Sequence, residues 1–176
     1  MSDGGWRFLD STVRRLAPLL TGLLGVLVDL LPLPDPAPET LAPLTTVCVI
    51  YFWTLYRPDL MTPLAVFVIG LALDAVGGMP LGLSALSFLI VRSVLLTGQR
   101  FLMAQPFVVI WACFALMVTA VGAVRWLLAS LWWGHLFAFQ PILLEAVLTV
   151  AIYPVIGWLL ARVHHHLSMA LHAAGS

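Results

Sequence analysis

The sequence predicts an all-α integral membrane protein, built as a single domain of six membrane-spanning helices over residues 1–176. Hydrophobic residues make up 62% of the 176-residue chain and charged residues only 9%, and the mean hydropathy is +1.06. A soluble domain of this length needs far more polar surface. Apolar stretches of about 18 or more residues, repeated along the chain, are typical of helices that cross a bilayer.

Six apolar segments follow one another, and short connectors with turn-forming residues separate them. The second segment is short for a span and the fifth is long, so we expect tilt or partial burial at their ends. No connector is long enough to fold alone. The predicted spans cover residues 15–33, 42–56, 61–77, 81–98, 105–129 and 140–161.

Prolines mark the starts of most spans, because the first turn of a helix tolerates a residue that lacks an N–H. Pro154 differs, since it lies inside the sixth span. It leaves the carbonyl of Val150 without its helical donor and should kink that helix. The prolines near span starts are Pro43, Pro63, Pro80, Pro106 and Pro141.

Three polar or turn-forming residues stand side by side between the second and third spans: Arg57, Pro58 and Asp59. Pro58 disfavours a helical conformation at Arg57 and should end the second span. Asp59 can cap the third helix, whose first N–H groups and dipole favour an acceptor. These structural roles explain the tripeptide without a further function, although Arg57 is also a candidate for a cytoplasmic partner contact.

The arginines are distributed unevenly between the two sides of the predicted bundle, and the chain has no lysine. Only Arg125 falls on the side that holds Asp35 and Glu39 of the first loop. The positive-inside rule therefore places both termini in the cytoplasm. The seven arginines of the opposite, cytoplasmic side are Arg7, Arg14, Arg15, Arg57, Arg92, Arg100 and Arg162.

Five ionisable residues lie inside the apolar runs, where an isolated charge is costly and each is therefore a candidate site. Four of them are expected in the outer layer of the membrane, and Arg125 and Glu145 form the best internal pair because their spans are adjacent and antiparallel. The surplus acids are either protonated or matched by a basic group on a partner's helix. Arg92 can instead snorkel to the cytoplasmic surface. The five are Asp29, Asp74, Arg92, Arg125 and Glu145.

Gly70 and Asp74 are four residues apart and share one helix face, so another helix can approach the carboxylate at the glycine. This face is the first candidate for partner binding. The segment GGMPLG that follows, with Pro80 and Gly82, forms either a tight outer turn or a short re-entrant piece. Tryptophans, Trp53 among them, are expected to mark the membrane interfaces.

The sequence contains no signature of catalysis, of a metal or cofactor site, or of nucleic-acid binding. HExxH, GxSxG and phosphate-binding loops are all missing, and no basic tail is present. We therefore expect neither an enzyme nor a cofactor, and no catalytic or metal-ligating residue is predicted.

The run YFWTLYRPDLMTPLAVFVIGLALDAVGGMPLG, from Tyr51 to Gly82, resembles the signature region of the MreD family of bacterial rod shape-determining membrane proteins. In that family an aromatic-rich second helix ends in Tyr-Arg-Pro, here at residues 56–58. A Gly-Leu-x-x-Asp sequence follows in the third helix, here at residues 70–74, and then a Pro-Leu-Gly, here at residues 80–82.

The resemblance implies a non-enzymatic scaffold of the cell-elongation machinery, in the bacterial inner membrane, that controls lateral peptidoglycan synthesis. The implied partners are MreC, which has a single span, a penicillin-binding transpeptidase, RodA and, indirectly, the filament protein MreB. It also implies a fold similar to the substrate-binding subunits of energy-coupling-factor transporters. The alternative is such a subunit itself, in which acids and aromatics such as Trp132, Trp133 and Phe137 line an outward pocket for a vitamin-like ligand.

Overall fold

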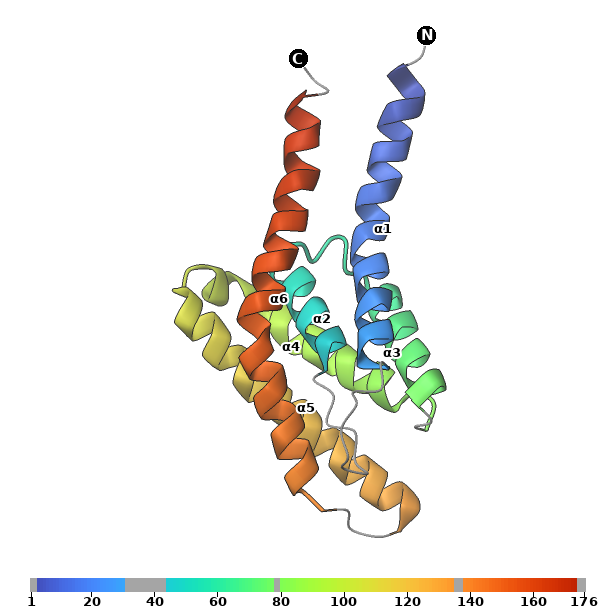
Figure 1. Cartoon of the computed structure of the whole chain (residues 1–176), viewed down its shortest axis with the longest axis vertical. Helices are drawn as coiled ribbons and strands as arrows, with labels where there is room; N and C mark the ends of the chain where they lie inside the picture. The colour runs from blue at the N-terminus through green and yellow to red at the C-terminus, as the bar shows by residue number, and fades with distance from the viewer. Residues whose placement is uncertain (1–2, 31–43, 78–79, 135–137, 174–176) are drawn as a thin grey trace.

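A computed structural model describes residues 3–30, 44–77, 80–134 and 138–173, with the backbone alone at 3–15, 129 and 163–173. In this part of the chain the fold is all-helical, which confirms the all-α part of the prediction (Figure 1). The six helices are α1 (Asp3–Asp29), α2 (Thr45–Tyr56), α3 (Pro63–Gly77), α4 (Leu83–Met103), α5 (Phe107–Trp133) and α6 (Gln140–Ala173).

The helix starts from α2 onward lie within three residues of the predicted span starts, because proline and turn residues mark them in the sequence. The two terminal helices are longer than predicted. Hydropathy reports the apolar part of a helix, whereas the backbone helix continues until a breaker or cap ends it, and residues 162–173 contain no proline or glycine. The N-terminal end of α1 and the C-terminal end of α6 lie at the same end of the molecule (Figure 1).

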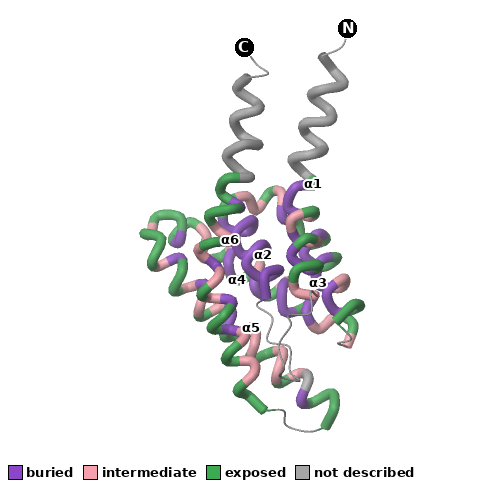
Figure 2. Tube along the Cα trace, in the orientation of Figure 1, coloured by how far each residue is buried: buried purple, intermediate pink, exposed green. Residues whose placement is uncertain are grey.

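The shortest helix, α2, forms the centre of the bundle. Eleven of its twelve residues are buried, and it packs against α1, α4 and α6 (Figure 2). At 1.5 Å per residue it is about 18 Å long, well short of the roughly 30 Å of hydrocarbon in a bilayer. A helix enclosed by protein can begin and end inside the membrane, provided that the protein satisfies its terminal polar groups.

Three helical segments in the described part are long and apolar enough to cross a membrane: Leu83–Met103, Phe107–Trp133 and Gln140–Arg162. The segments Leu16–Asp29, Thr45–Tyr56 and Pro63–Gly77 are apolar but shorter. The chain is therefore a helical protein with three clear candidate spans, and the count of six stays a prediction.

Trp53 corrects the expectation that the tryptophans mark the membrane interfaces. It is 0% exposed, and its indole N–H donates to Thr21 Oγ1 of α1 at 2.9 Å. The reason is the enclosure of α2 on all sides, which a local sequence pattern does not reveal. Elsewhere on α2, the ring of Tyr51 packs with those of Phe114 and Tyr153 and joins α2 to α5 and α6. The Tyr51 hydroxyl donates to the Ile110 carbonyl at 2.9 Å.

α6 continues through Pro154 as one helix and changes direction along its length (Figure 1). The carbonyl of Val150, which Pro154 deprives of its helical donor, accepts a hydrogen bond from the indole N–H of Trp111 on α5, at 2.9 Å. A side chain of the neighbouring helix thus satisfies the acceptor that the proline leaves open, as an apolar environment requires.

Trp111→Phe removes this donor and leaves the Val150 carbonyl without a partner. We expect the free energy of unfolding in detergent to fall by about 1 kcal/mol. Trp132, which is 72% exposed, provides the control, because Trp132→Phe changes an exposed side chain. Equal unfolding midpoints for the two variants would contradict the role given to Trp111.

Candidate functional site

The carboxylate of Asp74, at the end of α3, binds the start of α4. Asp74 is 1% exposed; its Oδ2 accepts the N–H of Gly82 at 2.9 Å, and both of its oxygens accept the N–H of Ser84, at 3.0 Å each. The first N–H groups of a helix have no partners within it, and the helix dipole favours a negative charge there. Asp74 therefore caps α4 from the preceding helix. Its partners are backbone N–H groups of the same chain, a third possibility beside the two that we expected, protonation or a basic group on a partner's helix.

Gly70 brings α3 and α4 into backbone contact one turn before Asp74. A Cβ built on Gly70 would overlap Ala85, lying 2.7 Å from its backbone nitrogen. The expected approach of another helix at this glycine does occur, and that helix is α4 of the same chain. The face that carries Gly70 and Asp74 is internal, which corrects the expectation that it is open to a partner.

The same arrangement joins α1 to α2. Asp29, the last residue of α1, accepts the N–H groups of Thr45 and Thr46 at 2.7 and 3.1 Å, and also the Thr45 hydroxyl. Gly25 lies one turn earlier, and a Cβ built there would be 3.1 Å from the Cα of Thr46. α1 thus supplies the acceptor for the Thr45 and Thr46 N–H groups at the start of α2, where the helix is enclosed by protein.

Sequence reasoning missed this repetition, although the signal is present as Gly-x-x-x-Asp at residues 25–29 and again at 70–74. Residues four apart lie on one helix face, so the glycine and the aspartate meet the same neighbouring helix. Each glycine lets the next helix approach, and each aspartate binds the N–H groups that this approach buries. We call these two motifs the Gly–Asp clamps.

Arg125 of α5 and Glu145 of α6 form an ion pair, with 3.8 Å between Arg125 Nη1 and Glu145 Oε1. This confirms the pairing predicted from the order of the spans. The carbonyl of Glu145 accepts the hydroxyl of Thr149 at 2.7 Å, and the oxygen of that hydroxyl accepts the N–H of Leu44 at 2.9 Å. Thr149 therefore ties α6 to the start of α2, next to the contacts of Asp29.

Gln99 and Arg92 of α4 hold the end of α2 and the turn that follows it. Arg92 Nε donates to the carbonyl of Met61, and Gln99 Nε2 donates to the carbonyl of Leu55, each at 2.8 Å. Snorkelling alone does not describe Arg92, which anchors a turn. Gln99 was not predicted, because a lone glutamine in a sequence carries no sign of the carbonyl that it binds.

In the tripeptide at 57–59 the structure confirms one predicted role, the end of α2 before Pro58, and contradicts another, the cap by Asp59. α2 ends at Tyr56, and Arg57, with φ −145° and ψ 68°, is not helical, as expected for a residue before Pro58. The predicted cap by Asp59 is wrong. α3 begins four residues later, and the hydroxyl of Thr62 accepts the N–H of Ala65 at 3.2 Å. Asp59 lies exposed in the turn.

Pro80 and Gly82 belong to a turn that leads into α4. Gly82 has a φ of +99°, which strains any residue with a Cβ, and it occupies the N-cap position of α4. The carbonyl of Pro80 accepts the N–H of Leu83 at 3.2 Å. A tight turn is therefore formed over residues 80–82, and residues 78–79 lie outside the described part.

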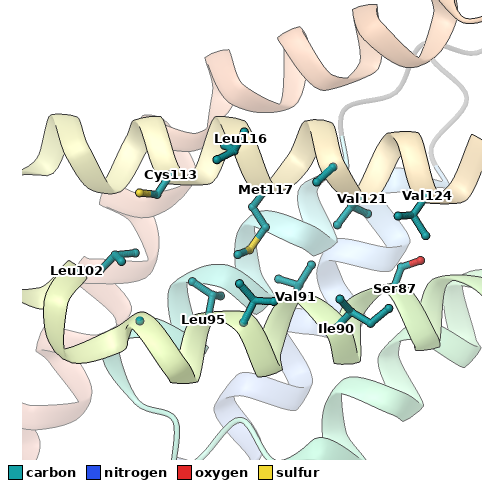
Figure 3. Close-up of a pocket in the computed structure, with 13 residues that line it drawn as sticks. Ser87, Ile90, Val91, Leu95, Leu102, Cys113, Leu116, Met117, Val121 and Val124 are labelled. Atoms are coloured by element: carbon teal, nitrogen blue, oxygen red, sulfur yellow. The ribbon is translucent and has the colours of Figure 1, made fainter.

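An apolar cavity of about 370 Å³ lies between α4 and α5. Figure 3 shows Val91 and Leu95 of α4 facing Met117 and Val121 of α5 across it. Its lining includes none of the outer acids and neither Trp132 nor Trp133, which the alternative prediction of a ligand pocket requires; Phe137 lies outside the described residues. Such a space offers a polar ligand few groups to bind.

A family model described as rod shape-determining protein MreD matches residues 10–163. The chain belongs to the MreD family. Membership gives it a role in the determination of rod shape and makes it a membrane protein of a family that is not known for enzymes. The comparisons with curated proteins and with solved structures give no match.

Within this MreD chain, the three short motifs that carry the resemblance all lie at helix junctions. Residues 56–58 end α2, residues 70–74 form the second Gly–Asp clamp, and residues 80–82 form the turn into α4 that the clamp binds. The motif residues thus fix how α2, α3 and α4 are joined.

Proposed function

We propose that this protein is a non-enzymatic scaffold of the rod complex in the bacterial inner membrane, and that it binds MreC and through MreC the wall synthases. The observation that carries the proposal is the use of the carboxylates inside the apolar segments. Asp29 and Asp74 bind helix starts, and Glu145 binds Arg125. These acids stabilise a fixed arrangement of helices, which is what a platform for other membrane proteins needs.

The proposal includes six spans with both termini in the cytoplasm. It is supported by the uneven distribution of arginines, seven on one side against one on the other. The position of the N-terminal end of α1 beside the C-terminal end of α6 also fits an even number of crossings (Figure 1). The short α2 can count as one of the six membrane segments, because α1 and α6 supply acceptors for the N–H groups at its start.

Because the acids are used inside the bundle, we expect partner proteins to bind its outer apolar surfaces. Lipid tails are as apolar as leucine, so helices associate in a membrane through close packing and polar contacts rather than through a hydrophobic driving force. MreC, with one span, is the first partner; a penicillin-binding transpeptidase and RodA follow, with MreB bound indirectly. The apolar α4/α5 cavity favours this scaffold over a transporter subunit, because it supplies no charged group for a vitamin-like ligand.

Coexpression with tagged MreC, followed by purification in mild detergent, tests the proposal. We expect this chain to be recovered with MreC, and not with a control single-span protein of similar length and hydropathy. The scaffold proposal would be contradicted if the chain were recovered equally with MreC and with the control protein, or if it were recovered with neither. Thermal stabilisation of the purified protein by a vitamin-like ligand in the absence of MreC would favour the transporter alternative.

A further inference from the structure

A second surface cavity lies between α1 and α3, at the end of the molecule where the turn between α2 and α3 is found. Its volume is about 450 Å³. Large apolar side chains on its rim are exposed: Leu16 to 43%, Leu64 to 71% and Val68 to 41%. We call it the α1/α3 groove; its lining comprises Leu16, Leu19, Asp59, Leu60, Thr62, Leu64, Ala65 and Val68.

Asp59 is the only ionisable residue in the lining of this groove. Because Thr62 caps α3, the Asp59 carboxylate is not needed for the start of that helix, and it lies exposed. The groove therefore combines an apolar wall with one negative charge at its end. In the proposed orientation this charge lies at the cytoplasmic surface of the membrane.

An apolar groove in a membrane can hold either a lipid or a helix of another protein, and the charge of Asp59 favours one of the two. A lipid of the cytoplasmic leaflet brings an anionic headgroup close to Asp59, which is unfavourable. A single membrane-spanning helix has lysine or arginine at its cytoplasmic end by the positive-inside rule, and such a residue is complementary to Asp59. The α4/α5 cavity has no charged residue in its lining and gives no comparable indication of its occupant.

We propose that the α1/α3 groove docks a single membrane-spanning helix whose cytoplasmic flank carries a lysine or arginine that pairs with Asp59. This inference rests on the proposed scaffold function and names the surface that the function uses. One apolar face of the incoming helix packs against Leu64 and Val68, and the basic residue at its cytoplasmic end reaches the turn between α2 and α3. An exposed ion pair adds little affinity, so the charge mainly sets the depth and direction of the helix.

Photo-crosslinking locates the partner helix. Benzoylphenylalanine in place of Leu64 should crosslink to coexpressed MreC, whereas the same group in place of Leu116, on the α4/α5 cavity, should not. The two leucines are matched, since they are 71% and 74% exposed. Crosslinks to MreC from position 116 alone, or crosslinks from position 64 to lipid or to a second copy of the chain alone, would overturn the inference.

A charge exchange tests the role of Asp59. Asp59→Lys should lower the recovery of MreC about fivefold, and changing the basic residues at the cytoplasmic flank of MreC to glutamate should restore it. The added lysine agrees with the positive-inside rule, so the topology should not change. If wild-type protein binds MreC but Asp59→Lys binds it equally well, the docking surface is wrong while the scaffold stands. If wild-type protein binds no MreC, the proposed function itself fails.

Discussion

Asp74→Ala is expected to lower the free energy of unfolding by roughly 2–4 kcal/mol, the sum of a lost helix cap and of buried N–H groups left without acceptors. The carboxylate accepts the N–H groups of Gly82 and Ser84, and Ser84 is itself fully buried. Without the carboxylate, the buried N–H of Ser84 loses its acceptor in an apolar environment. Reversible unfolding of the purified protein in mixed micelles measures the change.

Asp59→Ala is the matched control, since Asp59 is exposed and caps no helix, and we expect a change within about 0.5 kcal/mol. Asp74→Asn retains one acceptor oxygen, so its loss of unfolding free energy should lie between those of Asp74→Ala and Asp59→Ala. Asp59→Ala is a control for stability only, so binding of MreC is compared between Asp74→Ala and the wild-type protein. If Asp74→Ala keeps wild-type stability but no longer binds MreC, Asp74 contacts a partner, and its role as a helix cap is contradicted.

Helix positions could be predicted from the sequence because apolar length and proline placement are local signals. The starts of α3, α4, α5 and α6 follow from Pro63, Pro80, Pro106 and Pro141. The enclosure of α2 could not be predicted in this way. It depends on contacts with α1, α4 and α6, and the contact of Leu44 with Thr149 joins residues that are 105 positions apart.

The partners of the intramembrane charges were only partly predictable, for a physical reason. Arg125 and Glu145 could be paired, since each carries a charge that is visible in the sequence. Asp29 and Asp74 bind backbone N–H groups, which every residue except proline offers, so no residue type identifies them. The useful signal was the spacing between each aspartate and its glycine, found in both clamps.

A graded series of glycine substitutions tests the clamps without touching a polar group. Gly70→Ala should lower the free energy of unfolding by about 2–3 kcal/mol, because the new methyl group overlaps the backbone of Ala85. Gly25→Ala should have a smaller effect, of about 1 kcal/mol, because its nearest neighbour, Thr46 Cα, is 3.1 Å away. Gly77→Ala, at the end of α3 with nothing within 4 Å, should stay within about 0.5 kcal/mol of wild type.

The order of these three effects separates backbone contact from a general requirement for glycine. If glycine were needed only for flexibility, all three substitutions would act alike. Combining Gly70→Ala with Ala85→Gly sharpens the test, since the atoms nearest the new methyl group are the Cα and N of Ala85, which every residue retains. We expect this pair to recover little stability. Full recovery would mean that side chains, and not the two backbones, set the distance between α3 and α4.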